Sequence, residues 1–162
     1  MWDVKDTNVY YTVILMLIYS GCRIGEMLDL KKENVNLEER YFKIVESKTE
    51  AGIRTAPIAE KIYPFFEYWY NLNDCEYLLS TPDGKHFKYR NYYDSYWTPL
   101  VAPLGMEHRP HDTRHTCISM LTVAGVSDKV IKKIVGHKGQ SVTEVVYTHF
   151  EIEELIDAIN RI

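Results

Sequence analysis

The chain has 162 residues, of which 46% are hydrophobic and 26% charged, and its formal net charge is −4. These values are typical of one globular domain with a sizeable core, and the net charge gives no global sign of a nucleic-acid-binding protein. The charge is uneven, because residues 104–138 hold six Lys or Arg against three acids, whereas residues 141–162 hold five acids against one Arg. A basic patch therefore precedes an acidic tail.

Cysteine usage and hydropathy indicate where the protein works. The three cysteines, Cys22, Cys75 and Cys117, lack metal-type spacing, and together with the absence of a secretory leader they favour a reducing cytoplasm. The longest apolar run, residues 9–19, is too short to cross a bilayer and indicates a buried helix. The chain enters a helix almost at once, so we expect one domain cut from a longer protein.

The first part of the chain is predicted to form two helices. Residues 8–20 have a helical pattern that Asp6 or Thr7 can cap and that Gly21 can end. A second, short helix is predicted for residues 23–30, with its apolar side chains on one face.

The pattern then changes to the two-residue period of strands. Residues 41–47 and 53–58 are predicted to be antiparallel strands joined by a turn near residues 49–52, and residues 35–37 can add a third strand. Helices follow at residues 60–71 and 89–100, with a turn at "TPDGK" between them and Pro99 near the end of the second.

The C-terminal third is predicted to be helical. Its elements are residues 112–124, closed by Gly125; a helix from Ser127 or Asp128 to residue 135; a short helix that contains Tyr147 and is opened by the capping box 141–144; and residues 151–162. The predicted fold class is therefore mainly α with a small antiparallel β-sheet, or α+β.

Arg23 and Lys48 are the first candidates for chemistry. Arg23 follows "SGC" at a junction between helices, where its guanidinium could grip a phosphate bidentately. An ion pair with Glu26, three residues on, is the commoner arrangement for an arginine at this spacing. Lys48 lies at the end of the predicted hairpin, which can deliver it to a substrate, although most such lysines are simply solvated.

His111 and Arg114 lie three residues apart at a predicted helix start, a place that favours anions, and this spacing puts them on one face. His111 could equally be a capping or packing histidine. A metal held by His111, His115 and His137 is not favoured, because no acidic or thiolate third ligand is conveniently placed. Tyr147 is one of 13 tyrosines, and only its setting, in a short capped helix soon after His137, distinguishes it.

As an ordered set these residues are far more informative. The motifs "SGCRIGEMLDL", "SKTEAGIRTAPI", "HDTRHT", "VGHKG" and "TEVVYTH" resemble, in order and approximate spacing, those of the tyrosine recombinase (phage integrase) family. The resemblance runs from about residue 8 to residue 149 and covers the family's catalytic domain only. The family's pattern of Arg, Lys, His-x-x-Arg, His and Tyr is met at Arg23, Lys48, His111, Arg114, His137 and Tyr147. The motifs "HDTRHT" and "YTH" are more similar to integrases of phages and conjugative elements than to type IB topoisomerases.

The resemblance implies a metal-independent DNA strand transferase in which Tyr147 attacks a backbone phosphate. The product would be a 3′-phosphotyrosyl link and a free 5′-hydroxyl, so that rejoining needs no ATP. Lys48 would protonate the leaving 5′-oxygen, and His111 would assist the deprotonation of Tyr147.

Charge neutralisation is the other implied task. Arg23 and Arg114 would bind the non-bridging oxygens of the phosphate, and His137 would donate a hydrogen bond to one of them. Glu26 would brace Arg23, and His115 and His149 receive no role.

The resemblance also implies partners. These are double-stranded DNA and further copies of the chain, in a homotetramer on two DNA sites; no cofactor and no membrane is expected. Residues 1–162 would be the C-terminal catalytic domain of a recombinase whose N-terminal DNA-binding domain is absent, monomeric alone and weak in DNA binding. Residues 151–162 could dock on a neighbouring protomer or, equally, pack on their own domain. A bacterial cytoplasm is the expected location.

Several functions stay open at this point. The leading one is a site-specific recombinase that integrates or excises a phage or mobile element. Chromosome-dimer resolution would use the same residues, and a non-catalytic DNA-binding protein could share the fold. A helical protein-interaction domain would leave the ordered set of motifs as coincidence.

Overall fold

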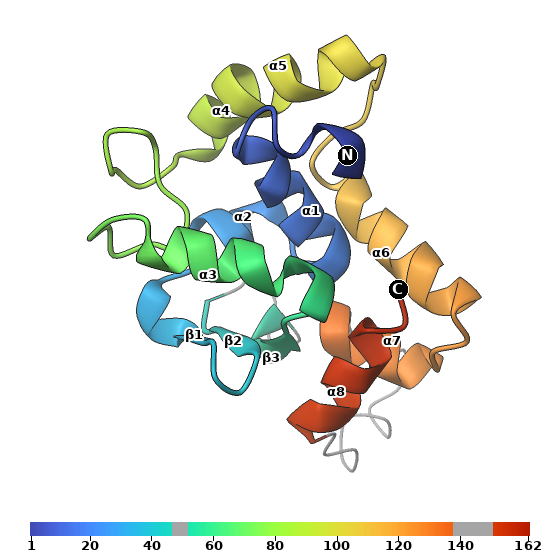
Figure 1. The fold of residues 1–162 in the computed structure, drawn as a ribbon. Helices are drawn as coiled ribbons and strands as arrows, with labels where there is room; N and C mark the ends of the chain where they lie inside the picture. The colour runs from blue at the N-terminus through green and yellow to red at the C-terminus, as the bar shows by residue number, and fades with distance from the viewer. Residues whose placement is uncertain (47–51, 138–150) are drawn as a thin grey trace.

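Helices surround a small antiparallel sheet in the computed structural model, which describes residues 1–46, 52–137 and 151–162 (Figure 1). The predicted α+β class is confirmed. The helical elements are η1 (Trp2–Val4), α1 (Tyr10–Ser20), α2 (Ile24–Leu28), η2 (Lys32–Asn34), η4 (Glu60–Ile62), α3 (Tyr63–Asn71), α4 (Tyr89–Tyr92), the π-helical turn η5 (Tyr93–Trp97), α5 (Thr98–Val101), η6 (Ala102–Leu104), α6 (Asp112–Val123), α7 (Asp128–Val135) and α8 (Ile152–Ile159). The strands are β1 (Val35–Asn36), β2 (Tyr41–Ile44) and β3 (Arg54–Pro57).

Helix α1 forms the centre of the core, as the apolar run in the sequence indicates. Residues 11–17 are all buried. They can be buried on every side because α1 packs against α3, η4 and α6. The observed helix starts two residues later than the predicted range 8–20.

The two ends of α1 differ in how well they were predicted. Neither Asp6 nor Thr7 caps the helix: Val9 directly precedes it without a side-chain capping bond, and the Asn8 Oδ1 atom accepts the backbone N–H of Tyr10 at 3.0 Å. Asn8 can accept this bond because its short polar side chain reaches the N–H group two residues on. The C-terminal end is as predicted, since Gly21 adopts φ 64°, the left-handed conformation that glycine allows.

The three strands form one antiparallel sheet in the order β1-β2-β3. Phe42 lies opposite Ala56, and Ile44 lies opposite Arg54. These four side chains share one face of the sheet because side chains alternate along a strand, and all four are buried. Strand β3 therefore places a charged side chain in the core.

The predicted hairpin is present in shortened form. The strands predicted at 41–47 and 53–58 correspond to β2 and β3, and the strand predicted at 35–37 pairs as β1. Residues 47–51, which hold most of the predicted turn, lie outside the described residues.

The middle helices are less regular than their sequence pattern. The segment predicted at 60–71 begins with the 3-10 turn η4, and the segment predicted at 89–100 is divided among α4, η5 and α5. Pro99 lies two residues before the end of this helical run, as predicted, but it falls in the first turn of the short α5. Proline has no N–H group to donate and its ring clashes with the preceding turn. The wider π-helical turn η5 directly precedes α5.

The C-terminal helices follow the predicted boundaries closely. Helix α6 is followed by Gly125 at φ 74°, and α7 begins after Ser127 and ends at Gly136, also at φ 74°. Helix α6 packs on α1, and α7 packs on α6 and β3. The capping box at 141–144 and the helix predicted around Tyr147 lie outside the described residues.

Helix α8 packs on its own domain in this single chain. It lies against β3 and α7, with Leu155 and Ile159 buried (Figure 1). The Asn160 Oδ1 atom, just after the helix, accepts the backbone N–H of Glu60 at 2.8 Å. The apolar face of this helix, which includes Leu155, Ala158 and Ile159, thus covers the core.

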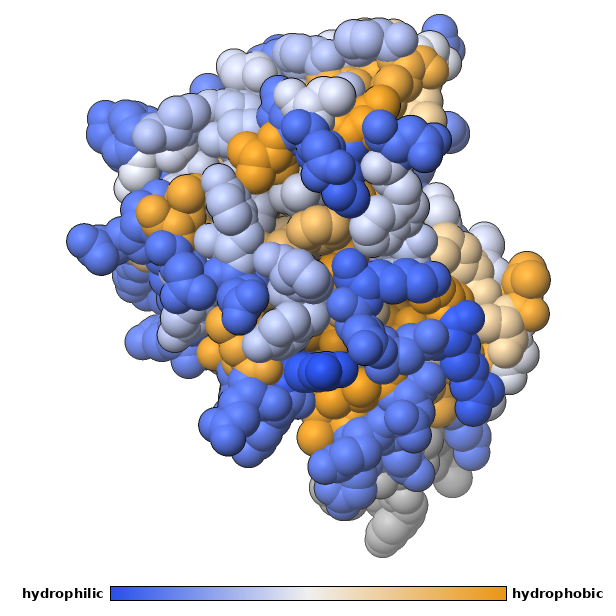
Figure 2. All heavy atoms as spheres, in the orientation of Figure 1, coloured by the Kyte–Doolittle hydropathy of each residue, from blue (hydrophilic) through white to orange (hydrophobic). Residues whose placement is uncertain are grey.

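The surface is mostly hydrophilic on the face shown in Figure 2, where hydrophobic residues appear in separate patches. Within the described parts of the chain, every helix falls short of the length and apolar character needed to cross a membrane.

Candidate active site

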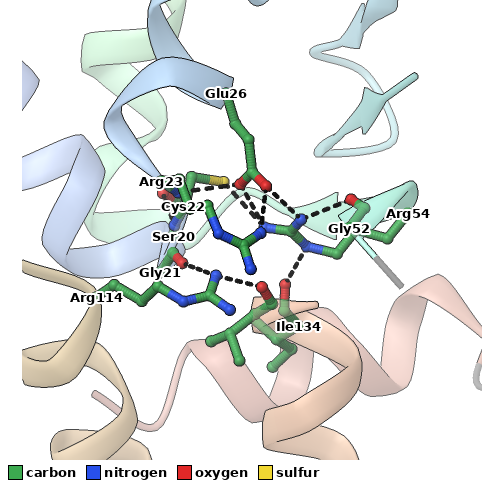
Figure 3. A network of polar contacts seen from close by, with 10 residues as sticks. Ser20, Gly21, Cys22, Arg23, Glu26, Gly52, Arg54, Arg114 and Ile134 are labelled. Atoms are coloured by element: carbon green, nitrogen blue, oxygen red, sulfur yellow. Dashed lines mark hydrogen bonds and ion pairs between the residues drawn. The ribbon is translucent and has the colours of Figure 1, made fainter. Parts of the chain in front are cut away.

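Arg23 directly precedes α2, where Glu26 holds it twice. The Glu26 Oε2 atom accepts the backbone N–H of Arg23 at 3.0 Å, and the Glu26 Oε1 atom accepts a hydrogen bond from Arg23 Nη1 at 2.6 Å (Figure 3). The ion pair that the i, i+3 spacing indicates is therefore present. It leaves the Arg23 side chain 32% exposed, so the pair does not prevent Arg23 from meeting a ligand.

Arg54 is the residue of this site that the sequence interpretation missed. Its side chain is only 2% exposed, and its Nη2 atom lies 3.0 Å from Glu26 Oε2. Its Nε atom donates to the carbonyl oxygen of Ile134 at 2.8 Å, and its Nη1 atom donates to that of Gly52 at 2.8 Å (Figure 3). A signal was available, because Arg54 stands two and four residues before the buried Ala56 and Ile58, at a core-facing position of a predicted strand.

Glu26 is the acidic centre of this network. Burial by itself raises the pKa of its carboxyl, but the hydrogen bonds and charge of Arg54, together with the contacts of Arg23, outweigh burial and hold that pKa below its ordinary value. The carboxylate is therefore charged at neutral pH, and it lies between two guanidinium groups.

Arg114 comes from the first turn of α6 and is 1% exposed. Its Nη1 atom donates to the carbonyl oxygen of Gly21 at 2.9 Å and to that of Val135. Its Nη2 atom is buried and has no hydrogen-bond partner within the described part of the chain. Burial, followed by the charges of Arg23 and Arg54, lowers the pKa of Arg114 to about 10, so it stays charged at neutral pH.

Two predicted histidines share the electrostatic environment of the arginines. His111 directly precedes α6, and His137 follows the turn that ends α7. Burial lowers the pKa of each imidazole, and the charges of Arg114 and Arg23 lower it further. Both imidazoles therefore favour the neutral form at pH 7.

His115 lies beside His111 and has no further role in the described site. The two rings are 4.9 Å apart at 86°, an edge-to-face arrangement. In the ranges that the structure describes, no group of three His, Cys, Asp or Glu side chains is arranged to hold a metal ion. Two further predicted residues, Lys48 and Tyr147, lie outside the described residues, as does His149.

Close backbone packing sets the spacing of the site. A Cβ atom added to Gly21 would lie 2.8 Å from Val135 Cγ1 and 3.1 Å from Cys117 Sγ. Because Gly21 lacks that atom, the end of α1 can approach α6 and α7, and the side chain of Arg114 can bond to both Gly21 and Val135. Four of the six predicted residues, Arg23, His111, Arg114 and His137, are thereby brought together.

Comparison with known proteins shows which family this chain belongs to. The model of the phage integrase family matches residues 3–154. The tyrosine recombinase XerA of Thermococcus kodakarensis is 30% identical over 150 residues, which cover 88% of this chain and 51% of the relative. A tyrosine recombinase of Thermosipho africanus is 24% identical over 154 residues, which cover 93% of this chain and 53% of the relative. The chain thus spans about half the length of these curated relatives.

Solved structures share the fold. The integrase from mycobacterium phage Brujita aligns with a TM-score of 0.72 at 20% identity, over 94% of this chain and 50% of that one. A XerA recombinase aligns with a TM-score of 0.70 at 22% identity, over 96% of this chain and 57% of that one. The Tn1549 transposon integrase, in complex with circular intermediate DNA, aligns with a TM-score of 0.70 at 22% identity. The alignment covers 89% of this chain and 55% of that one. The chain therefore belongs to the phage integrase family and has the fold of a tyrosine recombinase catalytic domain.

Proposed function

We propose that this chain is the catalytic part of a site-specific DNA recombinase that cleaves and rejoins strands through a 3′-phosphotyrosyl intermediate. The observation that carries the proposal is the convergence of three parts of the chain: Arg114 donates to the carbonyl oxygens of Gly21 and Val135, which stand two residues before Arg23 and His137. Among them is a buried guanidinium nitrogen, Arg114 Nη2, without a partner in the described chain. A phosphate oxygen is the acceptor that such a cluster fits best.

The charges of the site match the needs of phosphodiester chemistry. Negative charge builds on the non-bridging oxygens as a nucleophile adds to phosphorus, and it must be neutralised. Arg23 and Arg114 would donate hydrogen bonds to these oxygens, and His137 would donate one more. We place the neutralising charge on these side chains, so the proposed reaction is metal-independent.

The two proposed residues outside the described ranges complete the reaction. The Tyr147 hydroxyl oxygen would form a bond to phosphorus as the bond from phosphorus to the 5′-oxygen breaks. His111 would assist the loss of the tyrosyl proton, and Lys48 would give a proton to the leaving 5′-oxygen. Attack by a 5′-hydroxyl of another strand reverses these steps and releases Tyr147.

Double-stranded DNA is the proposed substrate, and movement of a phage or other mobile element is the proposed purpose. The similar structures include a transposon integrase in complex with circular intermediate DNA and a phage integrase. Relatives named XerA favour a second candidate, the resolution of chromosome dimers, which would use the same site. A bacterial cytoplasm is the setting we propose for either function.

The share of its relatives' length that this chain covers supports a proposal about domains. Because the chain spans about half of its relatives, we propose that an N-terminal domain supplies the other half of a clamp around DNA. With a net charge of −4, this chain alone should bind DNA weakly. Tight, specific binding by this chain alone in a gel-shift assay at physiological salt would overturn that view. On DNA we propose a homotetramer, in which residues 151–162 could dock on a neighbouring protomer.

A trapping assay tests the proposed function. The probe is a pool of nicked DNA duplexes of randomised sequence, in which the short strand beyond the cleavage point diffuses away and prevents rejoining. We expect an SDS-resistant protein–DNA band that disappears in Tyr147→Phe and persists in Tyr89→Phe, a tyrosine 51% exposed on α4. A band that survives Tyr147→Phe would refute the assigned nucleophile. If neither this chain nor a full-length parent gave a band, the non-catalytic DNA-binding function would replace the enzyme.

A further inference from the structure

We infer that Arg54 is a positioning residue for the proposed reaction: through Glu26 it holds Arg23, and through Ile134 it holds the end of α7, which His137 follows by two residues. The inference rests on the proposed function for its activity test. The contacts themselves stand independently of that function.

The hydrogen bonds of Arg54 leave it no capacity to bind a substrate. Its Nε atom donates to the carbonyl oxygen of Ile134. Its Nη1 atom donates to the carbonyl oxygen of Gly52 and lies 3.3 Å from Glu26 Oε1. Its Nη2 atom donates to Glu26 Oε2 at 3.0 Å and lies 3.7 Å from Cys22 Sγ. A guanidinium has five N–H groups, so every one of them is directed at the protein.

The two arginines assigned to phosphate binding differ from Arg54 in this respect. Arg114 keeps the buried Nη2 atom unpaired within the described chain. Arg23 uses one guanidinium nitrogen, Nη1, for Glu26 and is 32% exposed, against 2% for Arg54. Arginines of the same site therefore divide into two that can donate to a ligand and one that is committed to the scaffold.

Arg54 contacts both sides of the site, Glu26 at α2 and Ile134 at the end of α7, from a fixed position. It lies on β3, which is paired with β2, so its backbone is fixed by the sheet. Glu26 shares its two carboxylate oxygens between Arg54 and Arg23, so a shift of Arg54 would move the group that holds Arg23. The bond to Ile134 ties the last turn of α7, three residues before His137.

Lysine cannot replace this arrangement although it keeps the charge. Its single ammonium group cannot donate to Glu26, Ile134 and Gly52 in the fixed directions of a guanidinium. Arg54→Lys therefore removes the positioning contacts, while both phosphate-binding arginines are still present in the chain.

The activity test uses Arg54→Lys in the trapping assay under single-turnover conditions. We expect the cleavage rate to fall about 10- to 100-fold, the range that small misplacements of catalytic groups produce, with DNA affinity within about twofold of the parent. The matched control is Arg90→Lys, an 85% exposed arginine that pairs with Asp94 on the surface, and it should leave the rate unchanged. An unchanged rate in Arg54→Lys would overturn the inference.

A double variant separates positioning from a general loss of stability. Because Arg54 acts partly through Arg23, the loss of rate in the variant that combines Arg54→Lys and Arg23→Lys should be smaller than the product of the two single losses. Rate losses that multiply in full would show independent effects and overturn the inference. Should Arg54→Lys unfold under assay conditions, Glu26→Asp, which keeps the charge but shortens its reach, replaces it with the same expected pattern.

A measurement without DNA keeps the inference separate from the proposed function. The titration of the His137 imidazole is followed by NMR in the free chain, in Arg54→Lys and in Arg90→Lys. The charges of Arg114 and Arg23 help to lower the pKa of His137, so loosening Arg23 and the end of α7 should raise that pKa in Arg54→Lys only. If the wild-type chain formed no adduct but this shift appeared, the function would fail and the positioning would stand. An unmoved His137 would overturn the positioning.

Discussion

The arginine site and the aromatic cluster both contain fully buried side chains, but the two regions are stabilised by different forces. The aromatic cluster consists of Tyr10, Trp69, Phe87, Tyr92 and Tyr96, whose neighbouring ring centroids include Tyr10–Tyr96 at 4.4 Å and Tyr10–Trp69 at 5.4 Å. Its members bury apolar surface and pack in edge-to-face, tilted and stacked pairs, so burial itself stabilises the cluster. The arginine site buries Arg54, Glu26 and Arg114, for which burial is costly and must be offset by hydrogen bonds.

Each region contains one polar atom that the described chain leaves unpaired. In the aromatic cluster this is the Tyr92 hydroxyl, and in the arginine site it is Arg114 Nη2. Burial raises the pKa of Tyr92, so its hydroxyl stays neutral, and the free-energy cost of leaving that hydroxyl without a hydrogen bond is modest. Arg114 stays charged, so its unpaired nitrogen costs more and is available to an anion. Stability should therefore depend mainly on the aromatic cluster, and activity on the arginine site.

The largest effect on stability should come from Trp69→Ala. Trp69 is 1% exposed and its Nε1–H donates to Thr12 Oγ1 at 3.0 Å. We expect a loss of about 3–5 kcal/mol in the free energy of unfolding, because a large buried ring is replaced by a cavity. Urea unfolding measures it, with Tyr68→Ala as the control, since Tyr68 is the adjacent residue but 46% exposed. Equal losses in the two variants would contradict the role of burial.

Among the arginine variants, Arg114→Lys should give the largest effect on activity, with a smaller effect on stability. Lysine cannot hold Gly21 and Val135 while presenting a second nitrogen to a phosphate. We expect single-turnover cleavage to fall about 10²- to 10³-fold, as for other charge-stabilising donors. A variant that cleaved DNA at the parental rate would remove Arg114 from the proposed mechanism.

Gly21→Ala should have an intermediate effect because it forces the elements of the site apart. Its Cβ atom would meet Val135 Cγ1 at 2.8 Å, in a backbone conformation of φ 64°. We expect a destabilisation of about 1–3 kcal/mol, the usual range for overpacking. Gly25→Ala is the matched control: nothing lies within 4 Å of its added Cβ atom, so inside α2 it should stabilise by about 0.5–1 kcal/mol. Effects of the same sign in both variants would be inconsistent with the close approach at Gly21.

The smallest effect should be a pH dependence of stability that belongs to the arginine site. His111 and His137 have pKa values below the ordinary 6.5 in the folded chain, so on acidification the unfolded chain takes up protons first. Stability should be retained above pH 6.5 and should fall as the pH drops toward the folded-state pKa values. Both side chains are exposed, so solvent screens the effect.

Urea midpoints at pH 7.5 and pH 5.5 measure this dependence. The variant that combines His111→Gln and His137→Gln should lose less stability between these pH values than the parent. Equal losses in the two proteins would assign the dependence to other groups.

The amino-acid sequence by itself determined the helices and turns that depend on local rules. The apolar run before Gly21 predicted α1 and its end, because glycine alone tolerates the left-handed turn found there. The order of the motifs also indicated the family and its six candidate residues, which the family match from residue 3 to residue 154 supports at the level of the family. The division of the segment 89–100 into α4, η5 and α5 was not predicted, because helical periodicity does not show where one helical turn type gives way to another.

Only the tertiary structure decided how the site is held together. Arg54 is 28 residues from Glu26 and 80 from Ile134, so no local pattern relates them. The unpaired Nη2 atom of Arg114 likewise depends on which carbonyl groups the folded chain brings to its guanidinium. Hydrogen bonds between residues so distant in sequence depend on how α2, β3 and α7 pack together. Periodicity reports which face of each element is buried, but it does not report which elements meet.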